Sequence, residues 1–162
     1  MQLINKEFQY VEYDSIAELS AKDNFLFVQA QQAALLAYAP YSEFKVGAAV
    51  LLENGTVITG NNQENAAFPS GLCAERVAVF AAASQFPDIA IDTIAITAIS
   101  SKFKVNYPVA PCGSCRQVLA ESEKRQKKSF RLLLGGTNSK IFEIKGIESI
   151  LPFMFNSENL GM

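Results

Sequence analysis

The sequence contains no histidine and no tryptophan, and only three of its 162 residues are cysteine. Without histidine, the most common catalytic base is excluded. Three cysteines cannot all pair with one another in disulfides, so metal binding or catalysis is the better use for them. Any acid–base chemistry therefore has to use other side chains.

The sequence also lacks a large excess of charge of either sign and any long apolar run. The formal net charge is -2, and the basic run KRQKK (124–128) is short and typical of the solvated end of a helix, which disfavours binding to a nucleic-acid backbone. The first residues, MQLINKEFQYVEY, lack the basic start and apolar core of a signal peptide, and no apolar run reaches membrane-spanning length. We therefore expect a cytoplasmic protein that binds neither nucleic acid nor membranes.

The remaining composition is that of a compact chain, with 49% hydrophobic and 19% charged residues, and the length fits one domain. The strongest turn signal is Asn54-Gly55, which predicts a hairpin between two β-rich runs. About five strands alternating with helices predict a three-layer α/β arrangement. We expect helices over 23–38, 72–84 and 112–124, strands within 44–60 (two), 92–100, 130–136 and 140–144, a possible extra edge strand within 8–13, and a last helical turn or two within 147–155.

The three thiols lie at the starts of two of these helices. Cys112 and Cys115 form a CxxC pair in PCGSC, and Cys73 precedes the helix that begins in GLCAERV. Helix N-termini stabilise thiolates, and three thiolates can hold a zinc ion whose fourth position stays open for water. The spacing alone leaves a structural zinc site, a redox pair and a catalytic zinc site all open.

Glu75 follows Cys73 by two residues and has the chemistry of a proton carrier beside such a site. It can reach the same space as Cys73 only if the cysteine sits at or before the first helical turn. A carboxylate there can take a proton from a metal-activated water and pass it on. Arg76 can donate hydrogen bonds to a thiolate and withdraw some of its charge.

The order C-A-E followed by P-C-x-x-C is the signature of zinc deaminases, in the variant with cysteine in place of histidine. Over residues 38–162 the sequence resembles the small homotetrameric cytidine deaminases, in AYAPYSEFKVGAAV, NNQENAAFPSGLCAER, PCGSCRQVLAE and ILPFMFNSENL. The resemblance implies a five-stranded mixed sheet between helices in an α/β/α fold, with hydrolytic deamination of cytidine and deoxycytidine. It also implies Cys73, Cys112 and Cys115 as Zn²⁺ ligands, Glu75 as the proton shuttle and Arg76 as the thiolate-bonding arginine.

The same resemblance assigns the contacts to a nucleoside. It implies that Asn62 and Glu64 hold the ribose hydroxyls and that Phe44 lies near the pyrimidine. We also expect main-chain groups around Ala74 and Cys112 to bind the base edge. Phe155 matches an aromatic residue that a neighbouring subunit contributes, so active sites shared across a homotetramer are expected. The deaminase domain is then expected over residues 21–162, with an N-terminal extension of unassigned role over 1–20.

Three alternatives remain open from the sequence. A deaminase of blasticidin-type aminonucleosides would share CAE and PCxxC. A zinc-stapled interaction module without enzymatic activity would need a fourth protein ligand, and the sequence offers neither a histidine nor a fourth cysteine. A nucleic-acid editing deaminase would need a basic channel for the strand, which this acidic chain does not show.

Overall fold

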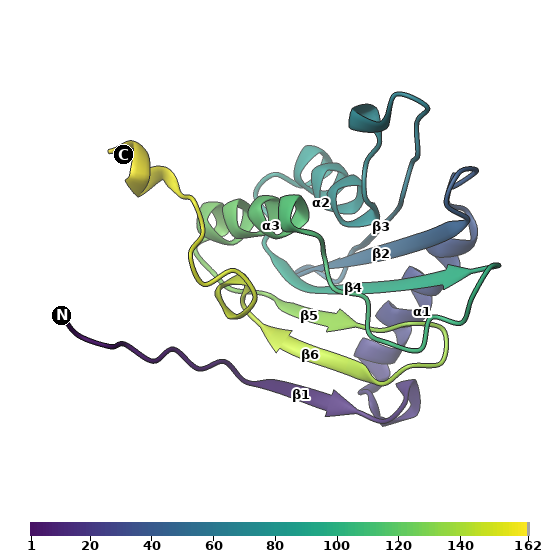
Figure 1. Cartoon of the computed structure of the whole chain (residues 1–162), viewed down its shortest axis with the longest axis horizontal. Coiled ribbons are helices and arrows are strands. Elements are labelled where there is room, and N and C mark those ends of the chain that lie inside the picture. Colours follow the sequence, from purple (N-terminus) through teal and green to yellow (C-terminus); the bar gives the residue numbers. More distant parts are fainter. Residues whose placement is uncertain (162) are drawn as a thin grey trace.

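The computed structural model describes residues 1–161 and has one six-stranded mixed sheet at its centre (Figure 1). The strand order across the sheet is β1-β6-β5-β4-β2-β3. Only β4 and β5 pair in parallel, and every other neighbouring pair is antiparallel. The strands are β1 (Tyr10–Tyr13), β2 (Phe44–Leu52), β3 (Val57–Asn61), β4 (Ile91–Ser100), β5 (Arg131–Leu134) and β6 (Ile141–Lys145).

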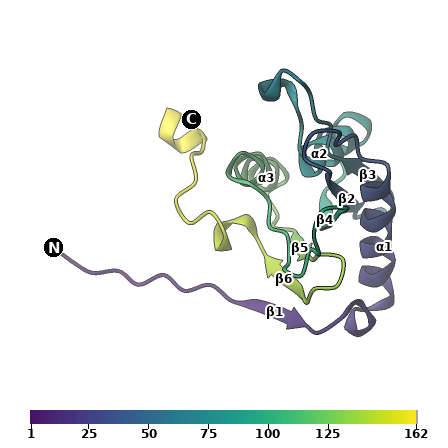
Figure 2. The same cartoon turned by 45° about the vertical axis from the view of Figure 1, so that its right-hand side comes forward.

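Three α-helices cover the two faces of this sheet in the described part of the chain. Helix α1 (Ala21–Leu35) packs on one face, while α2 (Ala74–Gln85) and α3 (Gly113–Gln126) lie on the other, as Figure 2 shows. The apolar core is accordingly split into two clusters, one on each side of the sheet. The expected three-layer α/β/α architecture is confirmed.

The predicted hairpin is present, and helix α1 begins slightly earlier than its pattern suggests. Leu52 and Thr56 close the turn around Asn54-Gly55, and Gly55 has a φ of 86°, which glycine adopts without strain. The N-cap of α1 is Ser20, whose side-chain oxygen accepts a hydrogen bond from the main-chain N–H of Asp23. Asp23 itself lies inside the first turn, and its carboxylate binds Arg131 of β5.

The expectation of five strands is wrong, because the leading segment adds β1 as a sixth strand beside β6. The possible edge strand within 8–13 is thus present. Side-chain contacts explain why it stays on the sheet: the Tyr13 hydroxyl donates to Glu143 at 2.8 Å, and the ring centroids of Tyr10 and Phe142 are 4.7 Å apart. Lys140 adds ion pairs with Glu12 and Asp14. These contacts bind the leading segment to β6 on the edge of the sheet.

A half-buried ion pair links α1 to the middle of the sheet. Two guanidinium nitrogens of Arg131 donate to the two carboxylate oxygens of Asp23, at 2.7 and 3.1 Å, and Arg131 also pairs with Glu143 at 3.3 Å. Burial raises the pKa of Asp23, but hydrogen bonds from Arg131 and Ser20 outweigh it, so the pKa lies below its ordinary value.

The C-terminal segment is less helical than expected. Within 147–155 only Ile147–Ser149 forms a short 3₁₀ turn, and a second turn, Ser157–Leu160, lies further on. Pro152 explains the interruption, since proline disfavours helical backbone at the residue before it and cannot donate a main-chain hydrogen bond. Among the described residues, none of the helices is long and apolar enough to cross a membrane.

Candidate metal centre and active site

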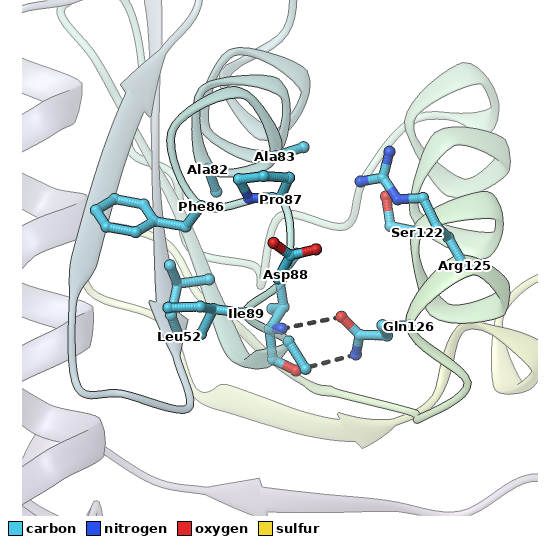
Figure 3. A pocket seen from close by; sticks show the side chains of 12 residues that line it. Leu52, Ala82, Ala83, Phe86, Pro87, Asp88, Ile89, Ser122, Arg125 and Gln126 are labelled. Carbon is cyan, nitrogen blue, oxygen red and sulfur yellow. Dashed lines mark hydrogen bonds between the residues drawn. The ribbon is translucent and has the colours of Figure 1, made fainter.

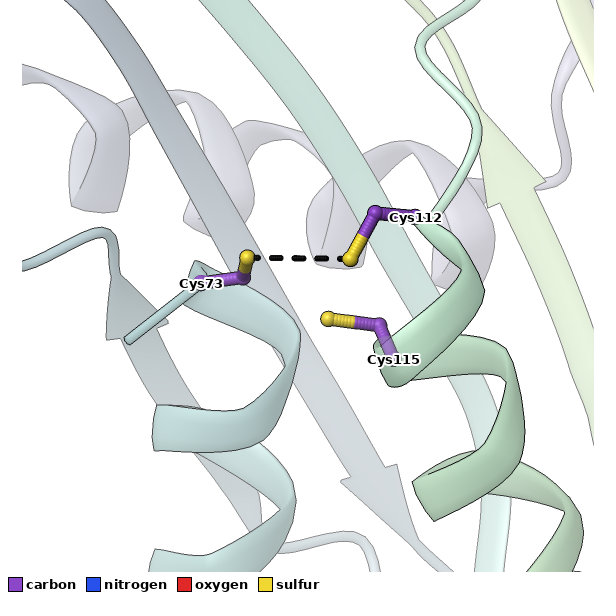
Figure 4. Close-up of side chains that lie close together, drawn as sticks. All are labelled: Cys73, Cys112 and Cys115. Atoms are coloured by element: carbon purple, nitrogen blue, oxygen red, sulfur yellow. Dashed lines mark hydrogen bonds between the residues drawn. The ribbon is translucent and has the colours of Figure 1, made fainter. Parts of the chain in front are cut away.

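The three cysteines meet in one cluster, although Cys73 lies 39 residues before Cys112 in the sequence (Figure 4). Their Sγ atoms all lie within 4.8 Å of one another, and those of Cys73 and Cys112 are 3.9 Å apart. Cys115 is buried, Cys73 is half-buried and Cys112 is exposed. The burial of the thiols therefore decreases from Cys115 to Cys112, so the site is closed toward the protein interior and open toward solvent.

Two helix N-termini position these thiols. Cys73 is the N-cap residue of α2 and Cys112 is the N-cap residue of α3, and neither helix has a side-chain cap hydrogen bond. The free N–H groups and the helix dipoles favour negative charge at this point. A hydrogen bond from Cys115 lowers the pKa of Cys73 to about 5; burial opposes this shift, and Arg76 and Cys112 support it. The same bond raises the pKa of Cys115 in the metal-free cluster.

The cluster fits a zinc ion. Tetrahedral Zn²⁺ with Zn–S bonds of about 2.3 Å holds its sulfurs about 3.8 Å apart, close to the spacing of Cys73 and Cys112. Within residues 1–161 the group consists of these three thiols, without a carboxylate or a fourth cysteine. Three protein ligands leave one coordination position open, which is the arrangement of a catalytic rather than a structural zinc site.

Glu75 and Arg76 flank the thiols as expected. Glu75 lies in the first turn of α2 with 5% of its surface exposed, and burial is the main reason why its pKa is raised above the ordinary value. Arg76 donates from Nη2 to the Cys73 sulfur at 4.0 Å, and its buried Nε atom has no partner among the described residues. The structure thus places a carboxylate with a raised pKa and a cation beside the thiols.

Asn62 and Glu64 lie close to Phe44, but both are already engaged with the protein. Asn62 accepts a hydrogen bond from the N–H of Val46 at 2.7 Å and donates to the carbonyl of Phe44 at 3.0 Å. Glu64 accepts from the N–H of Tyr41 at 2.9 Å and also from Ser42. An Asn amide has two donor hydrogens and two lone pairs, so Asn62 keeps capacity for one more partner of each kind.

Phe44 stacks on a second aromatic ring and Ala74 begins α2, whereas Phe155 lies on the surface. The Phe44 ring stacks with Phe103, with centroids 6.0 Å apart, and Ala74 is the fully buried first residue of α2. Phe155 is 59% exposed, and its carbonyl accepts a hydrogen bond from Gln117 of α3 at 2.7 Å. An exposed ring on a tail that is held to α3 is compatible with the expected contribution to a neighbouring subunit.

Arg116 is a further residue at this site that no spacing in the sequence singles out. Its guanidinium donates to the carbonyls of Pro111, at 2.8 Å, and of Ile150, at 3.0 Å. An arginine in the first turn of a helix is ordinarily a solvated cation, so the sequence alone conceals these contacts. They join the segment before Cys112 to the C-terminal segment.

A separate pocket lies at the opposite ends of the same two helices, away from the thiols (Figure 3). Its volume is about 310 Å³, and its lining includes Phe86, Asp88 and Arg125. The Gln126 side chain closes one wall by bonding to both the N–H and the carbonyl of Ile91. The pocket is thus separate from the metal centre.

An open three-thiolate site beside a buried carboxylate, on a three-layer α/β/α fold, defines the class of zinc-dependent deaminases. Comparison with known proteins agrees, since residues 20–129 match the family described as "Cytidine and deoxycytidylate deaminase zinc-binding region". The chain belongs to the cytidine deaminase family.

Individual relatives match most of the chain. It is 41% identical to the cytidine deaminase of Halalkalibacterium halodurans over 136 residues, which are 84% of this chain and 96% of that protein. It is 36% identical to the cytidine deaminase of Sporosarcina psychrophila over 136 residues, which are 84% of this chain and 93% of that protein. The crystal structure of a cytidine deaminase from Burkholderia pseudomallei aligns with a TM-score of 0.68 at 34% identity, covering 81% of this chain and 97% of that one.

Proposed function

We propose that this protein catalyses the zinc-dependent hydrolytic deamination of cytidine and deoxycytidine to uridine and deoxyuridine, with release of ammonia. The observation that carries the proposal is the meeting of Cys73, Cys112 and Cys115 beside the buried Glu75. Membership of the cytidine deaminase family supports the choice of substrate. Among the residues that the structure describes, no fourth ligand joins the thiol group, which argues against a purely structural zinc site.

The three thiolates hold the metal, and the carboxylate moves protons. A bound zinc ion supplies the lowered pKa of water that makes a nucleophile available near neutral pH. Glu75 would accept one proton from the attacking water, deliver it to N3 of the pyrimidine as the water oxygen adds to C4, and then carry the second proton of that water to the amine, which leaves as ammonia. Its burial suits this role, because a raised carboxyl pKa favours both taking up and returning protons near neutral pH. Arg76 offsets part of the thiolate charge at Cys73.

The nucleoside is held by groups around the same opening. Asn62 and Glu64 retain hydrogen-bonding capacity for the ribose hydroxyls, and Phe44 packs against the pyrimidine. Main-chain groups around Ala74 bind the base edge. Phe155 enters the site of a neighbouring subunit, so the working protein is a homotetramer with shared active sites.

The wider setting follows from the same activity. The protein acts in pyrimidine salvage in the cytoplasm, with a small nucleoside as its partner rather than nucleic acid or a membrane. Residues 21–162 form the deaminase domain, and residues 1–20 form an N-terminal extension that includes β1.

The first test is the loss of ultraviolet absorbance when cytidine is added to the purified zinc-loaded protein. We expect turnover of cytidine and deoxycytidine, and about one zinc per chain by elemental analysis. Blasticidin S is the parallel substrate, and turnover of that compound with cytidine left unchanged would replace the proposal with an aminonucleoside deaminase.

The second test is Glu75→Ala. General acid–base catalysis contributes about 10² to 10⁴ in rate, and here every proton transfer depends on one carboxylate, so nearly all turnover should be lost. The zinc content should stay close to one per chain, since Glu75 is not in the thiol group. A variant that keeps a near-normal rate would remove Glu75 from the chemistry.

A further inference from the structure

Arg116 holds both peptide groups that flank Cys112. Its Nε atom donates to the carbonyl of Pro111 at 2.8 Å, and its main-chain N–H donates to the carbonyl of Cys112 at 2.9 Å. The first carbonyl belongs to the peptide that enters Cys112 and the second to the peptide that leaves it. The second bond is the ordinary main-chain bond of the first helical turn and does not depend on the side chain, so the guanidinium specifically fixes the peptide that enters Cys112.

Cys112 needs such support because its own side chain has little. It is the exposed member of the cluster, it caps α3 without a side-chain hydrogen bond, and its sulfur contacts the Cys73 sulfur at 3.9 Å. By contrast, Cys115 is wholly buried. The position of the Cys112 sulfur therefore depends on the main chain around it, whereas packing fixes the position of the Cys115 sulfur.

The other end of the guanidinium reaches a well-anchored part of the chain. Nη1 of Arg116 donates to the carbonyl of Ile150, whose N–H donates to the carbonyl of Ile147 at 2.9 Å. Ile147 is fully buried, and its N–H donates to the Glu123 carboxylate of α3 at 3.0 Å. Arg116 therefore ties the segment before Cys112 to a fixed point of the core.

We propose that Arg116 is a positioning residue for the metal ligand Cys112, and that it strengthens zinc binding by holding the Pro111–Cys112 peptide against Ile150. The inference rests on the zinc site of the proposed function, but it concerns zinc affinity and not the identity of the substrate. Loss of a residue that orients a metal ligand typically weakens metal binding about 10- to 100-fold.

The experiment compares zinc retention by the folded, zinc-loaded protein against increasing amounts of a chromogenic chelator. Arg116→Gln removes the guanidinium but keeps a polar side chain, and it should lose zinc about 10- to 100-fold more readily than the unchanged protein. Arg125→Gln is the matched control, since it removes the same charge from the exposed last turn of α3. Gln117→Ala is the second control, because it releases the Phe155 carbonyl without touching Pro111. Both controls should stay within about threefold of the unchanged protein.

Arg116→Lys separates geometry from charge and covers the case in which Arg116→Gln fails to fold. Lysine keeps the charge but cannot hold two carbonyls in a fixed geometry, so zinc should still be lost at least about fivefold more readily. Unchanged zinc retention in either Arg116 variant, or an equal loss in Arg125→Gln, would overturn the proposal. Cytidine turnover is measured separately, so a protein that retains zinc without deaminating cytidine refutes the proposed function and still decides the role of Arg116.

Discussion

Gly60 allows β3 to approach the helix that carries Cys73 and Glu75, so Gly60→Ala is expected to disturb the active site from behind. A Cβ atom at this position would lie 2.5 Å from the main-chain nitrogen of Ala78 and 2.8 Å from the carbonyl oxygen of Ala74. Both atoms belong to the backbone of the first turns of α2, so no side chain can move aside to relieve the contact.

The size of the disturbance follows from these distances. An ordinary contact begins near 3.4 Å, so strand and helix must separate by about 0.9 Å at this point. Overpacking of this kind costs about 1–3 kcal/mol of stability. Ala74 lies between Cys73 and Glu75, and a displacement of about 1 Å in an active site can lower the rate about 100-fold.

The assay measures kcat/KM for cytidine, zinc retention and Tm for Gly60→Ala and for Gly113→Ala. Gly113 follows Cys112 in α3 but has open space around a built Cβ atom, so alanine there should leave activity and zinc binding nearly unchanged. We expect a loss of about 100-fold in kcat/KM for Gly60→Ala alone. Normal activity in Gly60→Ala, or equal damage in Gly113→Ala, would show that this close approach does not position the site.

Two further predictions concern the ion pair and the leading segment. Asp23→Asn should cost about 1–2 kcal/mol in urea unfolding at pH 7, because it removes the charged partner of two hydrogen bonds from Arg131, which is partly exposed and keeps Glu143 as a second partner. The folded pKa of Asp23 is lowered, so the stability that its carboxylate contributes is fully present above the unfolded pKa of about 3.9 and is lost as the pH falls through the folded pKa. The difference in unfolding free energy between Asp23→Asn and the unchanged protein should therefore shrink toward pH 3, and a difference that stays constant would contradict this. Removal of residues 1–13 deletes β1 and leaves the β6 edge unpaired, so it should lower Tm by about 5 °C or more and increase light scattering. Removal of residues 1–8 is the control, because it keeps β1. Equal Tm values for the two truncations would refute the stabilising role of β1.

The metal centre could be predicted from the sequence because its signals are local. CxxC spacing and the CAE triplet each place their thiols at a helix start, and a helix N-terminus is itself readable from nearby residues. Predicting one metal site from these two motifs requires a single long-range assumption, namely that the two helix N-termini meet. The structure shows that they do, on the same face of the sheet.

The features that the sequence conceals depend on contacts between distant segments. Asp23 has the pattern of an N-cap, but Arg131, which is 108 residues away, binds its carboxylate, and Ser20 caps the helix instead. The alternation within 8–13 indicates a possible edge strand, but its place beside β6 depends on distant contacts such as the bond between Tyr13 and Glu143, which are 130 residues apart. Arg116 likewise acquires its second partner, Ile150, only when the chain folds back on α3. Spacing along the chain carries no record of such pairs.

The attachment of the C-terminal segment to α3 has a practical bearing on how the protein should be handled. Arg116 and Gln117 hold Ile150 and Phe155 within a few residues of Cys112, so a purification tag fused after the last residue would pull on the surroundings of the thiols. The first residues instead extend away from the helices in both views (Figures 1 and 2). A tag fused at that end leaves the zinc-retention measurements undisturbed.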